Sequence, residues 1–356
     1  MGQQVVVVTN IPSPYQVELF DAVSASGLDI CAVYAFRHEA ARRWQARDLG
    51  HSHLFLDEQP VAARAAVLSA GLTVFSMYRH PVLRDYMCQR RAAGSPWCFW
   101  GERPGARRTG VAGRWYRRWR LGALHRSGVP IWGIGQWAVT GYQREFGMSR
   151  QYFNMPYFSN LRRFADVPVH RSTDKARTLL FSGSLIARKG VDLVAAAFAR
   201  AARRDAHLRL EILGFGKLEA SLRRQLAGLG DRVRFHGFRD WDELPEVYAR
   251  ADALIAPSRY DGWGLIIPEG LAAGLPVIGS DAMGAAWDLL ESGVNGWRVR
   301  AGEVSGVEAA IGDFAALSQT RLNEMRRAAR ASVMQHQLSH GVERFCAAVD
   351  GTRGAF

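Results

Sequence analysis

The stretch APSRYDGWGLIIPEGLAAGLPVIGSD, residues 256–281, decides how the chain is interpreted. The apolar run ADALIAPS (251–258) predicts a strand, and PVIGS (276–280) predicts the next buried strand. Between the two strands, Pro268 suits the first turn of a helix, and Gly274 is typical of the residue that ends one. A strand, a glycine-rich turn and a helix N-terminus form an anion site, because backbone N–H groups and the helix dipole converge there.

Two acids, Asp261 and Glu269, flank this turn and lie eight positions apart. Carboxylates beside an anion site can hold the hydroxyls of a sugar or a ribose. We therefore expect a phosphorylated sugar ligand, with its phosphates near the backbone of the residues after Asp261. These are Gly262, Trp263, Gly264 and Leu265.

This segment resembles the donor-binding signature of glycosyltransferase family 4, retaining enzymes of the GT-B fold. That family usually shows two glutamates separated by seven residues, with Gly-Phe-Gly after the first. Here the first acid is Asp261, one methylene shorter, and the aromatic residue is Trp263. The resemblance implies that Glu269 holds the ribose hydroxyls and that Asp261 holds the donor sugar.

The segment FSGSLIARKGVDLVAAAF (181–198) is similar to the family pattern Gly-Arg-Leu-x-x-x-Lys-Gly. Ser184 stands where the family has Arg, so Arg188 is the candidate for a second positive charge beside Lys189. Only 3 of the 46 basic residues are lysines, which favours a specific need for a flexible point charge on the diphosphate. The alternative is a solvated lysine at a helix start.

Two further segments of the second half resemble donor-binding elements of the family. In LGFGKLE (213–219), Gly214 and Gly216 would allow the backbone to approach the donor, or would form an ordinary turn. In RFHGF (234–238), the strand end would lie near the nucleotide base. His236 is a donor-side candidate there, with a structural role as the alternative.

The first half supplies the acceptor-side candidates. Pro14 and Tyr15 follow the first predicted strand, in a form typical of bacterial surface polysaccharide enzymes of the family; packing alone is the alternative for Tyr15. His80 and Glu102 follow two later strands, at the edge where open α/β sheets bind ligands. Glu102 is also a catalytic candidate with Asp261 and Lys189, or else it pairs with a nearby arginine. Those arginines are Arg103, Arg107 and Arg108.

The stretch RRTGVAGRWYRRWRLGALHR (107–126) predicts an amphipathic helix. Trp115 and Trp119 share one face, and Arg117 and Arg118 lie on the other. An aromatic face with an arginine-rich flank is typical of a helix that lies on an anionic membrane. The alternative is a helix that packs on its own sheet.

Alternating strand and helix patterns predict two Rossmann-like, doubly wound α/β domains with a ligand cleft between them, the GT-B architecture. We expect an N-terminal acceptor domain over 1–160 and a C-terminal donor domain over 161–337, separated by a proline-containing break near 155–177. A last helix is predicted over about 321–348. The resemblance implies that the end of the chain, about 338–356, packs back on the first domain.

The composition, 48% hydrophobic and 22% charged residues among 356, is that of a globular chain without a membrane-spanning or secretory segment. Four cysteines without metal spacing predict free thiols. The net charge of +13 is uneven, since residues 1–160 hold 19 basic and 10 acidic side chains. Such an excess is compatible with anionic lipid, a phosphorylated acceptor, nucleic acid or plain solvated surface.

Together these features predict a metal-independent, retaining glycosyltransferase without a cofactor. It would use a nucleotide-diphospho-sugar and a glycan or lipid-linked acceptor in bacterial cell-surface polysaccharide synthesis. We expect it in the cytoplasm or on the inner face of the membrane, without a nucleic-acid partner. An NAD(P)-dependent oxidoreductase is the alternative that GIGQWA (133–138) suggests, and an inert sugar-nucleotide-binding protein is another.

Overall fold

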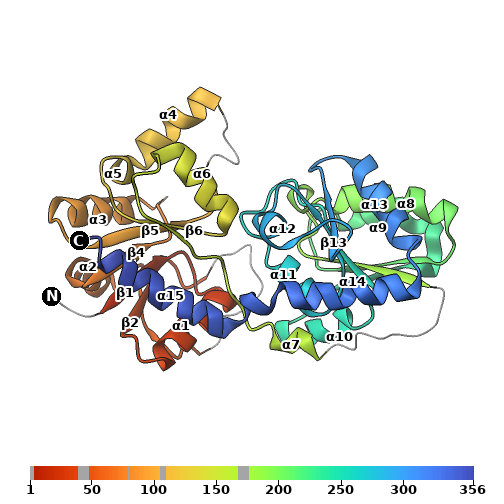
Figure 1. Ribbon diagram of the computed structural model, residues 1–356, viewed down its shortest axis with the longest axis horizontal. Coiled ribbons are helices and arrows are strands. Elements are labelled where there is room, and N and C mark those ends of the chain that lie inside the picture. The colour runs from red at the N-terminus through yellow and green to blue at the C-terminus, as the bar shows by residue number, and fades with distance from the viewer. Residues whose placement is uncertain (1–3, 39–47, 79, 105–109, 167–175) are drawn as a thin grey trace. The chain divides into compact units, whose positions relative to one another are not determined.

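The computed structural model describes residues 4–38, 48–78, 80–104, 110–166 and 176–356. The chain divides into two compact units, of which unit 1 comprises 1–160 with 337–356 and unit 2 comprises 161–336. Each unit is built on its own parallel sheet, with helices on both faces (Figure 1).

The sheet of unit 1 has the strand order β3-β2-β1-β4-β5-β6-β7 in the described residues. Its strands are β1 Val5–Thr9, β2 Ile30–Tyr34, β3 Ser52–Phe55, β4 Leu72–Phe75, β5 Trp97–Gly101, β6 Ile131–Gly133 and β7 Tyr152–Asn154. Its helices are α1 Pro14–Ala25, α2 Pro60–Ser69, α3 Pro81–Ala92, α4 Gly110–Arg120, α5 Gly122–His125, α6 Gln136–Phe146 and α15 Leu338–Arg353.

The sheet of unit 2 has the order β10-β9-β8-β11-β12-β13 over the part of the chain that the structure describes. Its strands are β8 Arg177–Ser182, β9 Leu208–Leu213, β10 Val233–Gly237, β11 Ala253–Ala256, β12 Val277–Ser280 and β13 Gly296–Val299. Its α-helices are α7 Arg162–Ala165, α8 Val191–Arg204, α9 Glu219–Leu226, α10 Leu244–Tyr248, α11 Ile266–Ala272, α12 Gly284–Leu289, α13 Val304–Ala315 and α14 Gln319–Ser332. Short 3-10 segments are η1 Ala187–Lys189, η2 Ala227–Arg232, η3 Trp241–Glu243 and η4 Met334–His336.

The valine run of β1 shows why the sheets are parallel and buried. Val5, Val6, Val7 and Val8 are completely buried. The strand pairs with β2 on one side and β4 on the other, with Val6 opposite Cys31 and Thr73. Helices cover both faces of such a sheet, so an uninterrupted apolar run fits it better than an alternating one.

The end of the chain belongs to unit 1. Helix α15 packs against α1, and Phe345 is buried among the aromatic rings of Trp100 and Trp132. The indole Nε1 of Trp132 donates to the Thr352 hydroxyl at 2.9 Å. Through these contacts α15, near the end of the sequence, packs on the sheet that contains β1, near its beginning.

The single long helix predicted over about 321–348 is wrong. Helix α14 ends at Ser332, η4 follows, and α15 begins at Leu338 after Gln337, whose backbone is extended (ψ 151°). Val333 and His336, both in unit 2, are buried at this break. The burial of these two side chains accounts for the interruption of the helix.

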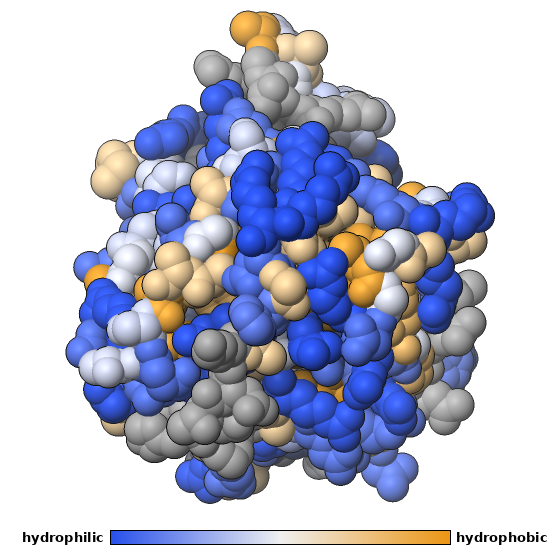
Figure 2. Space-filling view, turned by 90° about the vertical axis from the view of Figure 1, so that its right-hand side faces the viewer, coloured by the Kyte–Doolittle hydropathy of each residue, from blue (hydrophilic) through white to orange (hydrophobic). Residues whose placement is uncertain are grey.

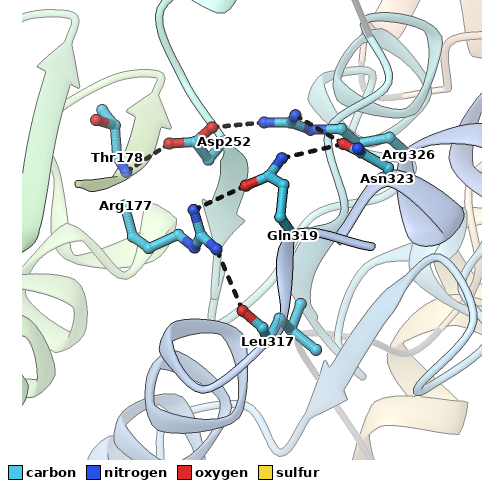
Figure 3. A network of polar contacts seen from close by, with 7 residues as sticks. All are labelled: Arg177, Thr178, Asp252, Leu317, Gln319, Asn323 and Arg326. Atoms are coloured by element: carbon cyan, nitrogen blue, oxygen red, sulfur yellow. Dashed lines mark hydrogen bonds and ion pairs between the residues drawn. The ribbon is translucent and has the colours of Figure 1, made fainter. Parts of the chain in front are cut away.

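A polar network ties α14 to the sheet of unit 2 (Figure 3). Asp252 accepts from the backbone N–H of Thr178 at 2.9 Å and from Arg326 Nη2 at 2.5 Å. Arg177 donates to the Gln319 side chain at 3.2 Å. Burial lowers the pKa of Arg326, and the Asp252 carboxylate opposes that shift. A buried cation of this kind depends on its partner, so the network fixes the helix at this strand end.

The surface of unit 2 on the side of α8, α9 and α13 is mostly hydrophilic, with hydrophobic side chains in small separate areas (Figure 2). Ion pairs such as Arg204–Glu308, at 2.8 Å, lie on these helices, and the Arg204 side chain is exposed. This is ordinary solvated surface.

Candidate functional site

The carboxyl ends of β8 and β11 bring three charged residues together. Lys189 Nζ lies 2.5 Å from Asp261 Oδ2, and Arg188 Nη1 lies 3.9 Å from the same oxygen. Arg188 also donates to the Tyr260 carbonyl at 3.0 Å. The Lys189 and Asp261 side chains are 22% and 15% exposed, so water screens the pair only in part. We call Arg188, Lys189 and Asp261 the charge cluster; its net charge is +1.

A second ion pair holds the backbone of the charge cluster in place. Arg259 donates from both terminal nitrogens to the Asp192 carboxylate, at 2.7 and 2.6 Å. The Asp192 carboxylate raises the pKa of Arg259. The backbone N–H of Arg259 also donates to the Arg188 carbonyl at 2.8 Å. Sequence reasoning missed this pair, since an acid in the first turn of a helix and a distant arginine are common on solvated surfaces.

Gly190 is required where η1 meets the end of β11. Its φ is 74°, and a Cβ there would lie 2.1 Å from the Pro257 carbonyl oxygen. Any other residue would push η1, and with it Lys189, away from Asp261. The glycine of the sequence motif is therefore explained by backbone packing.

The turn after Asp261 lies before α11. Within the described residues, the amides of Gly262, Trp263, Gly264 and Leu265 donate to no backbone carbonyl. The first three of these residues are buried. Buried amides need an acceptor, and consecutive N–H groups of this kind suit the oxygens of an anion.

Trp263 contributes to this turn through its backbone. Its side chain is only 1% exposed, and its ring lies nearly parallel to that of His336, with centroids 5.8 Å apart. The aromatic position of the motif therefore packs inside unit 2, where it supports the turn.

Glu269 lies in the first turns of α11 and is 7% exposed. The Tyr248 hydroxyl donates to its Oε2 at 3.3 Å. Burial, together with the Glu269 charge, raises the pKa of Tyr248 well above its usual value. Tyr248 thus stays protonated and orients the Glu269 carboxylate. The sequence analysis did not predict this role for Tyr248.

The loops that follow β8 and β9 in unit 2 pack closely against each other. A Cβ on Gly214, whose φ is 129°, would lie 1.9 Å from the Gly183 carbonyl oxygen. A Cβ on Gly216 would lie 2.6 Å from the Leu185 carbonyl oxygen. Because β8 and β9 are neighbours, these glycines pack the two strand-end loops together, and Ser184 is exposed beside them.

His236 lies on β10 and pairs with Glu211 on β9, with Nε2 3.0 Å from Oε2. Their side chains are 7% and 13% exposed. The contact between two neighbouring strands gives His236 a structural role, whatever it does beside a ligand.

The structure brings the acceptor-side candidates to one edge of the unit 1 sheet, because β1, β4 and β5 are adjacent and parallel. Pro14 begins α1, and the Tyr15 ring lies 4.7 Å from that of Tyr157. His80 precedes α3 and meets the ring of Phe36 edge-on. Glu102 is exposed after β5. Arg107 and Arg108, two of its candidate partners, lie outside the described residues.

The predicted helix over 107–126 is two helices, α4 and α5, and 107–109 lie outside the described residues. Trp115 and Trp119 are each 71% exposed, so they do not pack on the sheet of their own unit. Arg117 instead turns inward and pairs with Glu145 at 2.9 Å, while Arg118 is exposed. No helix in the described residues has the length and apolar character needed to cross a bilayer.

Comparisons with known proteins show which family and which solved structures this chain resembles. Residues 176–316, which lie in unit 2, match the family described as Glycosyl transferases group 1. An uncharacterized glycosyltransferase of Methanocaldococcus jannaschii is 33% identical over 125 residues, 35% of this chain and 32% of the relative. A GDP-mannose-dependent monoacylated alpha-(1-6)-phosphatidylinositol monomannoside mannosyltransferase of Corynebacterium glutamicum is 28% identical over 170 residues, 43% of this chain and 44% of the relative. The chain thus spans less than half the length of these two curated relatives.

Among solved structures, Alr3699/HepE from Anabaena in complex with UDP superimposes with a TM-score of 0.77 at 15% identity. The superposition covers 98% of this chain and 100% of that one. The same protein has also been solved with UDP-glucose. The resemblance of the second half to glycosyltransferases agrees with the match of residues 176–316 to the group 1 family, and the fold is of the GT-B type, with two parallel α/β domains.

Proposed function

We propose, from the premise that residues 176–316 are those of a group 1 glycosyltransferase, that this chain transfers a sugar from a nucleotide-diphospho-sugar to a hydroxyl group. The observation that supports this proposal most strongly is the charge cluster beside four buried or half-buried residues whose amides donate to no carbonyl. A cationic rim and a row of N–H groups together suit a diphosphate.

In the proposed reaction the bond between the anomeric carbon and the phosphate oxygen breaks, and its electron pair stays on the diphosphate. Lys189, Arg188 and the amides of 262–265 stabilise that charge as it develops. This chain's own cations and dipoles supply the stabilisation, so we propose that no metal ion or cofactor is needed.

We propose that configuration is retained. The acceptor hydroxyl then attacks from the face that the diphosphate leaves, and its proton passes to the departing phosphate oxygen. Asp261 would hold a hydroxyl of the sugar, and Glu269, oriented by Tyr248, would hold the ribose hydroxyls. The exposed Ser184 leaves the arginine position of the motif without a cation, and Arg188 would supply that charge.

The acceptor we propose is a glycan or a lipid-linked glycan of the bacterial cell surface, bound by unit 1. The name of the Corynebacterium relative states a phosphatidylinositol-based acceptor for that protein, which supports a lipid-linked one here. The exposed Trp115 and Trp119 support a peripheral contact with the cytoplasmic face of the membrane. Pro14, Tyr15, His80 and Glu102 are the residues we propose for the acceptor side.

Calorimetric titration with UDP, GDP, ADP and NADH tests the proposal. We expect one nucleoside diphosphate to bind, and we expect binding to be clearly weakened in Lys189→Ala and Glu269→Ala but kept in Arg204→Ala, a 74% exposed control on α8. Binding of NADH without any nucleoside diphosphate would instead favour an oxidoreductase. Binding that is unchanged in both site variants would refute the site.

A further inference from the structure

Helix α4 exposes the side of a helix that globular proteins normally bury. Val111, Trp115 and Trp119 follow one another at intervals of four residues, so they lie along one face. They are 70%, 71% and 71% exposed. A surface helix normally turns such an apolar stripe toward the core.

The polar side of α4 fixes this orientation. Arg117 donates to both oxygens of Glu145 on α6, at 3.3 and 2.9 Å, and the two side chains are only 15% and 9% exposed. Arg120 Nε donates to the Tyr116 hydroxyl at 3.2 Å, and its guanidinium lies 5.2 Å from the Trp119 ring centroid. The helix is thus attached through an arginine, and its aromatic side chains point outward.

A pocket of about 240 Å³ lies next to this apolar face, between α3 and the α4–α5 segment. Arg84, Arg120 and Arg126 contribute to its lining. Asp85 is the acid among the described lining residues, and its Oδ2 accepts from Gln89. The lining therefore carries a net charge of about +2, counted from full side-chain charges.

None of the three arginines forms an ion pair with an acid among the described residues, and Arg120 bonds to the Tyr116 hydroxyl. Arg84 Nε is buried and has no hydrogen-bond partner within that part of the chain. Arg126 is exposed. Guanidinium groups in such a pocket match the oxygens of a phosphate.

We propose that this pocket binds the phosphate of an anionic phospholipid while the apolar face of α4 enters the bilayer interface. Trp119 connects the two features, since it lines the pocket and belongs to the exposed stripe. A phospholipid with its phosphate in the pocket would therefore have its acyl chains along Val111 and Trp115. This adjacency selects a lipid over a free phosphate.

The inference deepens the proposed peripheral membrane contact and is independent of sugar transfer. Sedimentation of the full chain with vesicles measures it, using phosphatidylcholine alone and phosphatidylcholine with phosphatidylglycerol. We expect Arg84→Gln/Arg126→Gln to weaken binding to the anionic vesicles about tenfold or more, and to change binding to neutral vesicles little. The matched control is Arg91→Gln/Arg144→Gln, which removes the same charge from exposed positions of unit 1 outside the pocket.

If the pocket variant and the control lost binding to anionic vesicles equally, the proposed pocket site would be refuted, because net charge alone would then explain the binding. If Trp115→Ser kept full vesicle binding, the apolar face would be refuted. If inorganic phosphate stabilised the wild type but not the pocket variant while both bound vesicles equally, the site would be one for free phosphate.

Should the double variant fail to fold, Arg126→Gln alone tests the pocket, since that side chain is exposed. UDP titration of the same variants separates the two proposals. Retained UDP binding with lost vesicle binding supports both. Pocket-dependent vesicle binding in a chain that binds no nucleotide would refute the transferase proposal alone.

Discussion

Asp261→Asn should raise affinity for the nucleoside diphosphate and at the same time slow sugar transfer. The charge cluster has a net charge of +1, because Asp261 neutralises one of its two cations. Replacement by Asn leaves both cations to the diphosphate. Two unit charges about 4 Å apart interact by about 4 kcal/mol at an effective dielectric constant of 20, and screening reduces this for half-exposed groups.

We therefore expect UDP, or whichever nucleoside diphosphate binds, to bind about tenfold more tightly to Asp261→Asn. Lys189→Ala should do the opposite, weakening binding by about tenfold to a hundredfold, since the cluster then has no net charge. The double variant restores the net charge of +1, so it should bind close to wild type. Because the two side chains are in contact, the affinity of the double variant also measures the coupling between them.

Transfer should respond differently. Lys189→Ala should lower kcat/KM by about 10²- to 10³-fold, the range found when one charge-stabilising group is removed from an active site. Asp261→Asn should also lower kcat, because the proposed sugar contact weakens. Calorimetry gives the affinities, and coupled detection of released nucleotide gives the rates. Weaker nucleotide binding in Asp261→Asn would contradict the electrostatic account, as would unchanged transfer in both variants.

The remaining predictions concern packing and stability. Arg326→Ala should destabilise unit 2 by about 3–5 kcal/mol in urea unfolding, since it leaves Asp252 without its buried partner; an effect below about 1 kcal/mol would show that the network is dispensable. Gly190→Ala should weaken nucleotide binding while far-UV circular dichroism stays unchanged, because the added Cβ meets the Pro257 carbonyl; wild-type affinity would disprove the packing argument. Burial lowers the pKa of His51 from its usual 6.5, so the unfolded chain takes up the proton first as the pH falls. The stability of unit 1 should therefore decrease from about pH 6.5 downward, and His51→Gln should lose less stability over that range; identical pH profiles would be the contrary result.

The strands were well predicted from sequence because burial on both faces leaves a plain apolar signal. The predicted strand segments 251–258 and 276–280 contain β11 and β12, the strands that the structure shows there. The short β7, Tyr152–Asn154, was missed, because its residues are only half-buried and a proline follows closely. Helical periodicity also predicted one continuous helix across Val333–Gln337. The structure shows a break there, at which His336 is buried.

The charge cluster was only partly predictable. The resemblance to the family motifs marked Lys189 and Asp261 as candidates, but nothing in the sequence indicated that the two side chains meet. The pairing of Arg259 with Asp192 and of Tyr248 with Glu269 depends on which strand ends are neighbours. Sequence patterns report the local structure, and those contacts arise only once β8 and β11 are placed side by side.

The exposed face of α4 is a different case. The helical wheel separated Trp115 and Trp119 from the arginines, yet the same pattern fits a helix buried on its own sheet. Arg117 decides between the two, because its nearly buried pairing with Glu145 turns the aromatic side outward. An inward-facing arginine on a polar helix side cannot be recognised without the neighbouring helix.

A crystal structure of the protein with bound UDP or the nucleoside diphosphate that calorimetry selects would test the central claim most directly. We expect phosphate oxygens within hydrogen-bonding distance of Lys189 Nζ and of amides in 262–265, with the ribose at Glu269. A diphosphate bound elsewhere, with Lys189 still paired to Asp261, would contradict the account.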